Sequence, residues 1–319
     1  MSQVAVIGLG AIGLPMALRL TGAFPVTAYD PAPDRLRAAV EGGATAAASP
    51  ARAAAGREVA VLAVRDQAQV ETALFGADGV AGSGFGGVVV LTSTIGPAAV
   101  RSIAERLSAA GIGLVDAPVS GGPVRAGKGD LLILAGAPDE ALTAAGPVLE
   151  RLASTLTVVG QKAGDGQVFK TINQLLAGVH IAAAAEAIAL ARGLGVDPKT
   201  VIAALSQGAG SSFMFADRGP RMLEAYRGGA EVKSRLDIFV KDMSIVTEVA
   251  RQSHVATPLA ATAEQLYLLA ESHGLGEHDD SSVVTLLSPR QDPGHDPGHD
   301  PGHDPRHDPR NDSRNGEVA

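Results

Sequence analysis

One lysine stands near the start of a long apolar segment, where it could transfer a proton. Lys170 lies in "AGDGQVFKTINQLLAGVH", residues 163–180. The ordinary pKa of a lysine, near 10.4, is too high for a base at neutral pH. Partial burial, a helix N-terminus or a neighbouring cation would each lower that pKa. A lysine in such surroundings can remove the proton of a hydroxyl group and return it in the reverse reaction.

The helical period indicates how Lys170 is placed. At about 100° per residue, one apolar stripe contains Phe169, Ile172, Leu176, Val179 and Ala183. Lys170, Asn173 and Gln174 fall on another face, which an ordinary amphipathic helix would turn to solvent. That same face continues as the apolar residues Ala177, Ile181, Ala184 and Ile188. We therefore expect this face to be buried one turn beyond Gln174, with Lys170 at the edge of a pocket.

A glycine motif opens the chain. "GLGAIG" follows the β-branched run "VAVIG" (4–8) and comprises Gly8, Leu9, Gly10, Ala11, Ile12 and Gly13. In a dinucleotide-binding βα unit the first glycine makes a tight turn, the second lets the backbone approach a pyrophosphate, and the third allows close packing of helix and strand. A glycine-rich turn in an unrelated α/β domain is the alternative. The position before a helix favours dinucleotide binding.

An acidic residue supports this interpretation. Asp30 ends the next strand pattern, "VTAYD", 22 positions after Gly8, close to the separation of about 20 expected for a ribose-binding carboxylate. Such a carboxylate accepts hydrogen bonds from the ribose hydroxyls of NAD and would repel the 2′-phosphate of NADP. The first cation beyond Asp30 is Arg35. The sequence therefore predicts NAD, with NADP disfavoured.

Alternating patterns predict the elements that position these residues. β-Branched runs lie at 4–8, 26–30, 59–64, 88–92 and 112–118, with alanine-rich helical stretches between them. This alternation predicts βαβ units and a mostly parallel, doubly wound sheet. Strand patterns stop after "TLTVVG" (155–160), and a new helix start is expected at Asp197–Pro198. We expect an α/β Rossmann domain at residues 1–163 and an all-α domain at 164–288.

The tail, residues 289–319, differs in composition. It contains three DPGH tetrads followed by DPRH, DPRN and DSRN, and it offers no apolar segment to bury. Such a segment is predicted to be disordered. Four of the chain's eight histidines lie there, but nothing fixes the geometry that a metal site needs. No metal site is therefore predicted.

Composition excludes several classes of protein. The 319 residues are 46% hydrophobic and include 39 glycines, as in a soluble globular chain, and the absence of cysteine excludes disulfides and thiolate metal sites. The N-terminus lacks a basic signal region. The best apolar run, 175–191, contains His180 and Glu186 and suits a buried helix. A net charge of −8 with 3% aromatics argues against nucleic acid. We expect a cytoplasmic protein with a small-molecule ligand and neither membrane nor nucleic-acid partners.

Four segments together resemble the β-hydroxyacid dehydrogenase family, which includes 3-hydroxyisobutyrate dehydrogenase. They are "VIGLGAIGLPMA" (6–17), "DAPVSGGP" (116–123), "GQVFKTINQ" (166–174) and "DIFVKD" (237–242). The resemblance extends over residues 2–288. "SSFMFADR" and "EHDDSSVV" are similar to the L-threonate dehydrogenase subgroup, which oxidises four-carbon sugar acids with NAD. The tail has no counterpart in that pattern.

The resemblance implies roles for particular residues. Ser120, Gly121 and Gly122 would hold the substrate carboxylate, and Lys170 would be the catalytic base. The family commonly has asparagine four residues after the lysine; here Gln174 occupies that position and Asn173 precedes it, so either could contact substrate. Cofactor contacts near the nicotinamide are implied for Ala63, Val64, Thr94 and Lys241. Without the resemblance these residues would be ordinary turn, strand-end, cap and surface positions.

The favoured hypothesis is an NAD-dependent dehydrogenase of a small hydroxy acid, with L-threonate as the first choice. Alternatives within the family are a reductase of tartronate semialdehyde, glyoxylate or succinic semialdehyde, and 3-hydroxyisobutyrate dehydrogenase. A rival of another class is a non-catalytic NAD-binding interaction protein, which the presence of Lys170 disfavours. The apolar surface expected on the helical domain predicts a homodimer or homotetramer.

Overall fold

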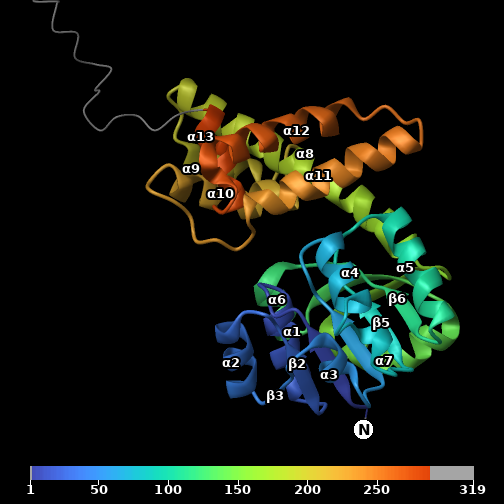
Figure 1. Cartoon of the computed structure of the whole chain (residues 1–319). Helices are drawn as coiled ribbons and strands as arrows, with labels where there is room; N and C mark the ends of the chain where they lie inside the picture. The colour runs from blue at the N-terminus through green and yellow to red at the C-terminus, as the bar shows by residue number, and fades with distance from the viewer. Residues whose placement is uncertain (1, 288–319) are drawn as a thin grey trace, which may run out of the picture.

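The computed structural model describes residues 2–287, which form two parts (Figure 1). One part is a sheet with helices on both faces, and the other consists of helices packed together. The predicted tail, 289–319, lies outside the described residues.

Five parallel strands form the centre of the sheet. They are β1 (Val4–Ile7), β2 (Val26–Tyr29), β4 (Val59–Leu62), β5 (Val88–Leu91) and β6 (Gly113–Asp116). Their order in the sheet is β2-β1-β4-β5-β6, and β1, β4 and β5 are buried along their whole length. Strands covered on both faces have continuous apolar sequences, which is why the short Val-rich runs identified them.

The rest of the sheet departs from the parallel arrangement. β3 (Thr45–Ala46) extends one edge beside β2, while β7 (Val119–Ser120) and β8 (Leu131–Gly136) lie at the other. β8 pairs antiparallel with β6 and β7, and β9 (Ala153–Gly160) pairs parallel with β8. The sheet is therefore mostly parallel, as predicted, with an antiparallel junction after β6.

Helices cover both faces of the sheet. They are α1 (Gly13–Thr21), α2 (Pro33–Glu41), α3 (Pro50–Ala54), α4 (Gln67–Phe75), α5 (Pro97–Ala109), α6 (Gly122–Lys128) and α7 (Asp139–Leu152), with a 3₁₀ turn at Val80–Gly82. Met16 of α1 and Val148 of α7 belong to the core on one face. Ala53 of α3 and Ile103 of α5 belong to the core on the other. This doubly wound layering confirms the predicted fold class.

The second part is built from helices around α8. It contains α8 (Asp165–Gly193), α9 (Pro198–Leu205), α10 (Phe213–Ala225), α11 (Leu236–Gln252), α12 (Pro258–Ala270) and α13 (Val284–Leu287), with short turns at Glu271–Leu275 and Asp280–Val283. Asp197 caps α9, since its carboxylate accepts from the backbone N–H groups of Lys199 and Thr200. The predicted helix start is thus confirmed. The division predicted at residues 163 and 164 falls between β9 and α8.

The long helix α8 passes from the sheet into the middle of the helical part (Figure 1). By length and composition alone it could cross a membrane. Here Ile181 and Ile188 are fully buried among the other helices, and the Tyr267 hydroxyl donates a 2.7 Å hydrogen bond to the Gly178 carbonyl. α8 therefore serves as the central helix of this part.

The two faces of α8 differ in exposure. Lys170 and Gln174 are only 7% and 6% exposed, whereas the apolar Phe169, Ile172 and Leu176 are 48%, 57% and 50% exposed. The polar face is thus buried, as expected for the segment beyond Gln174, and burial begins already at Lys170. The apolar stripe that begins with Phe169, Ile172 and Leu176 is exposed to solvent in the single chain.

Candidate active site

The predicted cofactor-contacting residues of the first part follow strands that end at one edge of the sheet. Ile7 lies opposite both Tyr29 and Leu62, and Leu91 lies between Leu62 and Asp116. Because these strands are parallel, their carboxyl ends form one edge, and the order reverses direction at β1. Ligands of open α/β sheets bind outside such an edge at the point of reversal. The glycine motif, Asp30, Ala63–Val64 and Thr94 all follow strand ends there.

The three glycines of the motif fit the predicted roles. Gly8 has φ of +92°, and a Cβ there would lie 2.5 Å from the Ala63 carbonyl oxygen. A Cβ on Gly13 would lie 2.0 Å from the Gly8 carbonyl oxygen, whereas no atom lies within 4 Å of the corresponding point at Gly10. Gly8 and Gly13 therefore permit close packing, and Gly10 leaves the backbone open to a ligand such as a pyrophosphate.

Asp30 holds the glycine motif against the end of β2. One carboxylate oxygen accepts from the Leu9 N–H at 2.7 Å, and the other accepts from the Ala32 N–H at 2.8 Å. A carboxylate has about four lone-pair positions, so each oxygen can still accept from a ribose hydroxyl. The Arg35 guanidinium approaches Asp30 to 3.9 Å and is more than half exposed. These residues fit the adenosine end of a dinucleotide.

The remaining predicted cofactor residues connect the strand ends with the helical part. The Val64 N–H donates to the Ser93 hydroxyl at 3.0 Å, which joins the ends of β4 and β5. The Lys241 ammonium group on α11 donates to the Thr94 carbonyl oxygen at 2.7 Å. Ala63 lies against Gly8 and Gly13. The structure thus brings Ala63, Val64, Thr94 and Lys241 to one region of the sheet edge.

Gln167 joins the first turn of α8 to this edge. Its amide oxygen accepts from the N–H groups of Ile95 and Gly96 at 3.0 and 3.1 Å. Its amide nitrogen donates to the Ser93 carbonyl at 3.1 Å and to the Asp116 carboxylate at 2.8 Å. All four hydrogen-bonding positions of the amide are occupied, and the side chain is fully buried. The start of α8 is therefore fixed to the ends of β5 and β6.

Asp116 completes this joint from the sheet side. The carboxylate oxygen that Gln167 Nε2 does not contact accepts from the N–H groups of Gly164 and Gln167, both at 2.9 Å. Burial raises the pKa of Asp116 to about 6, against the lowering effect of hydrogen bonds from Gln167, Gly164 and Gly166. Asp116 and Gln167 lie in the segments "DAPVSGGP" and "GQVFKTINQ", but no role was predicted for either residue. Polar residues inside otherwise apolar segments were the available signal.

Lys170 lies one turn beyond Gln167 on the same helix. Burial lowers the pKa of its ammonium group from 10.5 to about 8, while Asp242 opposes this change and Lys241 reinforces it. Among residues 2–287 no hydrogen-bond acceptor is assigned to its amine. The amine is therefore close to half neutral at mildly alkaline pH and available to a ligand.

A buried carboxylate organises the surroundings of Lys170. Asp242 accepts from Gln174 Nε2 at 2.5 Å and from Lys241 Nζ at 2.6 Å. The Gln174 amide oxygen accepts in turn from Asn173 Nδ2 at 2.9 Å. The predicted residues Asn173, Gln174 and Lys241 thus form one network with Asp242. Sequence reasoning had assigned no role to Asp242, although it is part of the "DIFVKD" segment.

The turn predicted to hold a carboxylate follows the same sheet edge. Ser120 lies four residues after Asp116 and ends β7, while Gly121 and Gly122 have φ of +144° and +74°. Side-chain-bearing L-residues rarely adopt these values, so glycine is required. No atom lies within 4 Å of the Cβ position at Gly122, which leaves that backbone approachable. The turn can present a hydroxyl and backbone N–H groups to an anion.

These groups together suit hydride transfer to a nicotinamide at the sheet edge, with an amine of lowered pKa to accept a hydroxyl proton. A family model described as the NAD binding domain of 6-phosphogluconate dehydrogenase matches residues 3–160. A second model, described as NAD-binding of NADP-dependent 3-hydroxyisobutyrate dehydrogenase, matches residues 164–287. The two family models together cover both parts of the described chain and support a nicotinamide cofactor.

Individual relatives agree with these models. The chain is 40% identical to an L-threonate dehydrogenase of Cupriavidus necator, covering 92% of this chain and 98% of that protein. It is 33% identical to a 3-hydroxyisobutyrate dehydrogenase of Pseudomonas aeruginosa, covering 90% and 98%. A crystal structure described as 3-hydroxyisobutyrate dehydrogenase from Salmonella typhimurium is similar with a TM-score of 0.82 and 36% identity, covering 90% of this chain and all of that one. The chain therefore belongs to the β-hydroxyacid dehydrogenase family of 3-hydroxyisobutyrate dehydrogenase-like oxidoreductases, near its L-threonate dehydrogenase members.

Proposed function

We propose that this enzyme is an NAD-dependent dehydrogenase of a small hydroxy acid, with L-threonate as the first candidate. The observation that carries the proposal is Lys170, a buried amine whose pKa is lowered to about 8. It lies on a helix that Gln167 fixes to the cofactor edge. The similarity to L-threonate dehydrogenase supports the choice of substrate.

The proposed reaction converts a hydroxy acid and NAD⁺ into an oxo acid, NADH and a proton. Bound nicotinamide would accept the hydride from the carbinol carbon. Lys170 takes the hydroxyl proton as general base, and the resulting ammonium stabilises the oxygen of the new carbonyl. Oxidation at C2 gives a 2-oxo acid, and oxidation at C3 gives a 3-oxo acid that can decarboxylate.

Other residues would hold the substrate in place. Ser120 and the backbone of Gly121 and Gly122 suit its carboxylate. Gln174 uses one N–H for Asp242, so its second N–H is free for a substrate oxygen. Asn173 donates to Gln174 and keeps its own amide oxygen as an acceptor for a substrate hydroxyl. Both amides therefore stay in the proposed site.

The choice of NAD rests on Asp30. Both of its oxygens retain lone pairs for ribose hydroxyls, and its charge would repel a 2′-phosphate. Arg35, 3.9 Å from Asp30 and largely exposed, is the cation that could attract such a phosphate. The description of the second matching family model also names an NADP-dependent dehydrogenase. Parallel titrations with NAD and NADP test this choice, and a higher kcat/KM with NADP would reverse it.

We further infer that a second copy of the chain covers the apolar stripe of α8, giving a homodimer or homotetramer. The stripe begins with Phe169, Ile172 and Leu176, and Leu190 on the same face is 63% exposed. Exposed apolar stripes of this length commonly mark protein interfaces. We propose a cytoplasmic location. We also propose that the boundary between the two domains lies between residues 163 and 164.

Initial rates of cofactor reduction test the proposed function directly. The panel contains L-threonate, D-erythronate, D-glycerate, 3-hydroxyisobutyrate and 3-hydroxypropionate, each with NAD and NADP, and Lys170→Ala serves as the control. We expect turnover of L-threonate with NAD that the variant loses. A preference for another acid would move the enzyme to a different substrate within the family.

The rival functions predict different results. A physiological reductase of tartronate semialdehyde, glyoxylate or succinic semialdehyde would oxidise cofactor with those aldehydes faster than it reduces cofactor with the acids. A non-catalytic interaction protein would bind NAD without turnover in either direction. Either result would exclude the proposed dehydrogenase.

A further inference from the structure

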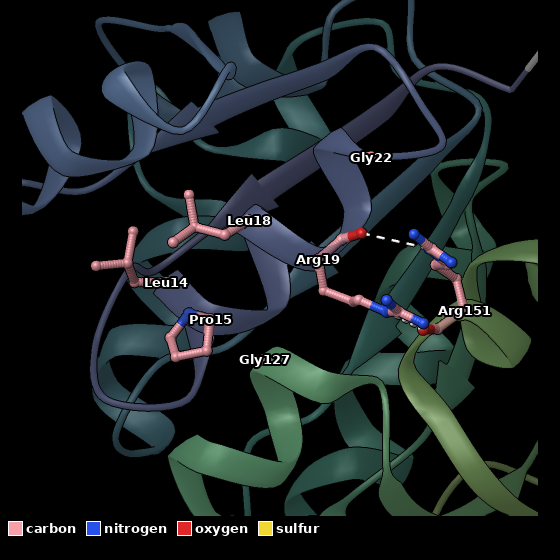
Figure 2. A pocket seen from close by; sticks show the side chains of 7 residues that line it. All are labelled: Leu14, Pro15, Leu18, Arg19, Gly22, Gly127 and Arg151. Atoms are coloured by element: carbon pink, nitrogen blue, oxygen red, sulfur yellow. Dashed lines mark hydrogen bonds between the residues drawn. The ribbon is translucent and has the colours of Figure 1, made fainter.

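A hollow of about 380 Å³ lies beside α1, away from the candidate active site (Figure 2). Leu14, Pro15, Leu18 and Arg19 of α1 line it, together with Gly127 of α6 and Arg151 of α7. This volume falls in the range of small-ligand pockets, about 300–1,000 Å³. None of these six residues belongs to the proposed catalytic or cofactor-binding set.

The hollow lies on the face of the sheet that α1, α6 and α7 cover, whereas the predicted cofactor residues follow the strand ends at the carboxyl edge. α1 starts at Gly13 beside the glycine motif, and Arg19 is in its last turn. Arg151 lies at the end of α7, two residues before Ala153, which pairs with the first residue of β8. A ligand held by both arginines would therefore lie about two helical turns from the glycine motif, given a rise of about 1.5 Å per residue.

Two arginines are fixed against each other at this hollow. Arg19 Nε donates to the Arg151 carbonyl oxygen at 3.3 Å, and Arg151 Nε donates to the Arg19 carbonyl oxygen at 3.4 Å. Figure 2 shows the two guanidinium groups side by side on one wall. Each group has five N–H donors, and among residues 2–287 only the Nε donor of each has an assigned acceptor. Both side chains thus present unused donors in a fixed position.

The charges of Arg19 and Arg151 are not neutralised within the described part of the chain. No carboxylate of residues 2–287 forms an ion pair with either guanidinium. Nearby Arg125 on α6, by contrast, pairs with Asp130 at 2.9 Å. Two adjacent, like-charged groups repel each other, and an anion between them would remove that repulsion. Guanidinium groups bind carboxylate and phosphate through paired hydrogen bonds.

Part of the lining of the hollow is apolar. Leu14, Pro15 and Leu18 line it from α1, the same helix that carries Arg19 (Figure 2), and Leu18 is 39% exposed. A Cβ on Gly22 would lie 3.2 Å from Arg151 Nη2. A larger residue at position 22 would therefore crowd the Arg151 guanidinium, whereas glycine leaves room for it. A fitting ligand would carry an anionic head for the arginines and a short apolar body for the leucines.

We propose that this hollow is a binding site for a small organic anion, a carboxylate or phosphate with a short apolar body. The site contacts both α1, which starts at the glycine motif, and α6, which starts at Gly122 of the carboxylate-binding turn.

Calorimetric titration of the full chain, saturated with NADH, tests the site. The probes are butyl phosphate and inorganic phosphate. We expect one butyl phosphate per chain, bound at least tenfold more tightly than inorganic phosphate, and at least a tenfold loss of affinity in both Arg19→Gln and Arg151→Gln. Arg52→Gln is the matched control, because Arg52 is an exposed arginine of α3 on the opposite face of the sheet. Absence of binding, or equal binding by all variants, would overturn the proposal.

A second measurement uses the unaltered protein and so does not depend on the folding of the variants. Hydrogen–deuterium exchange is followed with and without butyl phosphate. We expect slower exchange in residues 14–22 and 148–153. Protection confined to residues 8–13 or to the Ser120 turn would show that the anion occupies the cofactor or substrate region instead, which would exclude the proposed site.

Discussion

In its first turns, α8 buries its polar face and exposes its apolar face, which is the reverse of an ordinary surface helix. Lys170 and Gln174 are polar and almost fully buried, whereas Phe169, Ile172 and Leu176 are apolar and about half exposed. Burying a charge costs free energy unless other groups compensate, and leaving large apolar side chains in water costs free energy as well. This is the pattern that the proposed function requires, with the polar face turned toward substrate and cofactor and the apolar face covered by a second copy of the chain.

Replacement of Lys170 on the buried face should have the largest effect on activity. Lys170→Met keeps most of the side-chain volume but removes the amine, and we expect kcat/KM to fall about 10²- to 10⁴-fold because proton transfer is lost. Lys170→Arg should be similarly inactive, since a guanidinium does not deprotonate near pH 8. Initial rates at saturating NAD measure both effects, and a variant with near-normal rates would exclude Lys170 as the base.

Lys170→Met should also stabilise the fold at pH 7. Burial lowers the pKa of Lys170 from 10.5 to about 8, so below pH 8 the charged form is present in both the folded and the unfolded chain and the full penalty applies. That penalty disappears as pH rises from 8 to 10.5. Lys170→Met should therefore raise the free energy of unfolding at pH 7 by up to about 3 kcal/mol, as measured by urea denaturation. A loss of stability would contradict the assigned burial cost.

The exposed face can be tested by placing a charge on it. Ile172→Asp would put a carboxylate into the proposed interface, and loss of one buried isoleucine contributes about 1.5–3 kcal/mol. We expect the dissociation constant of the oligomer to rise about 10- to 100-fold, as measured by sedimentation velocity over a concentration series. Val40→Asp, at a 43% exposed position of α2, is the control and should change nothing. If the Ile172→Asp variant assembles with the same dissociation constant as the unaltered protein, the apolar stripe of α8 is not the interface.

Asp242→Asn separates positioning from proton transfer. Asp242 raises the pKa of Lys170 and binds Gln174 and Lys241. Removal of its charge should lower that pKa, so the rise of kcat/KM with pH, set by the neutral amine, should move to lower pH. The plateau should also fall, on the order of tenfold, because asparagine keeps only one of the two oxygens that accept from Gln174 and Lys241. Asp130→Asn, at an exposed pair with Arg125, should leave the pH profile unmoved.

Local motifs made the cofactor edge predictable from sequence. The glycine motif and Asp30 belong to one βα unit with fixed separations, and the Val-rich strand runs give the order of elements directly. β8, "LLILAG", was not among the predicted strands although the turn-forming "GKGD" (127–130) precedes it, and its antiparallel pairing depends on partners elsewhere in the sheet.

The joint between the two parts could not be predicted because its contacts are distant in sequence. Gln167 bonds to Asp116 across 51 positions and to Ser93 across 74, and Gln174 reaches Asp242 across 68. The helical period predicted that the face of α8 with Lys170 is buried beyond Gln174, but it does not show which residues of other elements that face contacts. The helical period singled out Lys170, and the resemblance to the family gave Lys170 and Gln174 their expected roles. Asp242, which accepts from Gln174 and raises the pKa of Lys170, became evident only in three dimensions.

A second contact between the two parts should matter far less than the buried joint. Arg65, after β4, pairs with Asp237 of α11 at 2.9 Å, but the Arg65 side chain is 48% exposed and Asp237 also pairs with Arg235. Exposed ion pairs contribute about 0.2–1 kcal/mol and are screened by salt. Arg65→Ala should therefore lower the free energy of unfolding by less than about 1 kcal/mol and leave KM for NAD within about twofold, a change of less than about 0.5 kcal/mol. Urea denaturation and rate measurements at low and high salt test this. A tenfold change in KM would show that this ion pair, in addition to the Lys241–Thr94 hydrogen bond, sets the position of α11 against the cofactor edge.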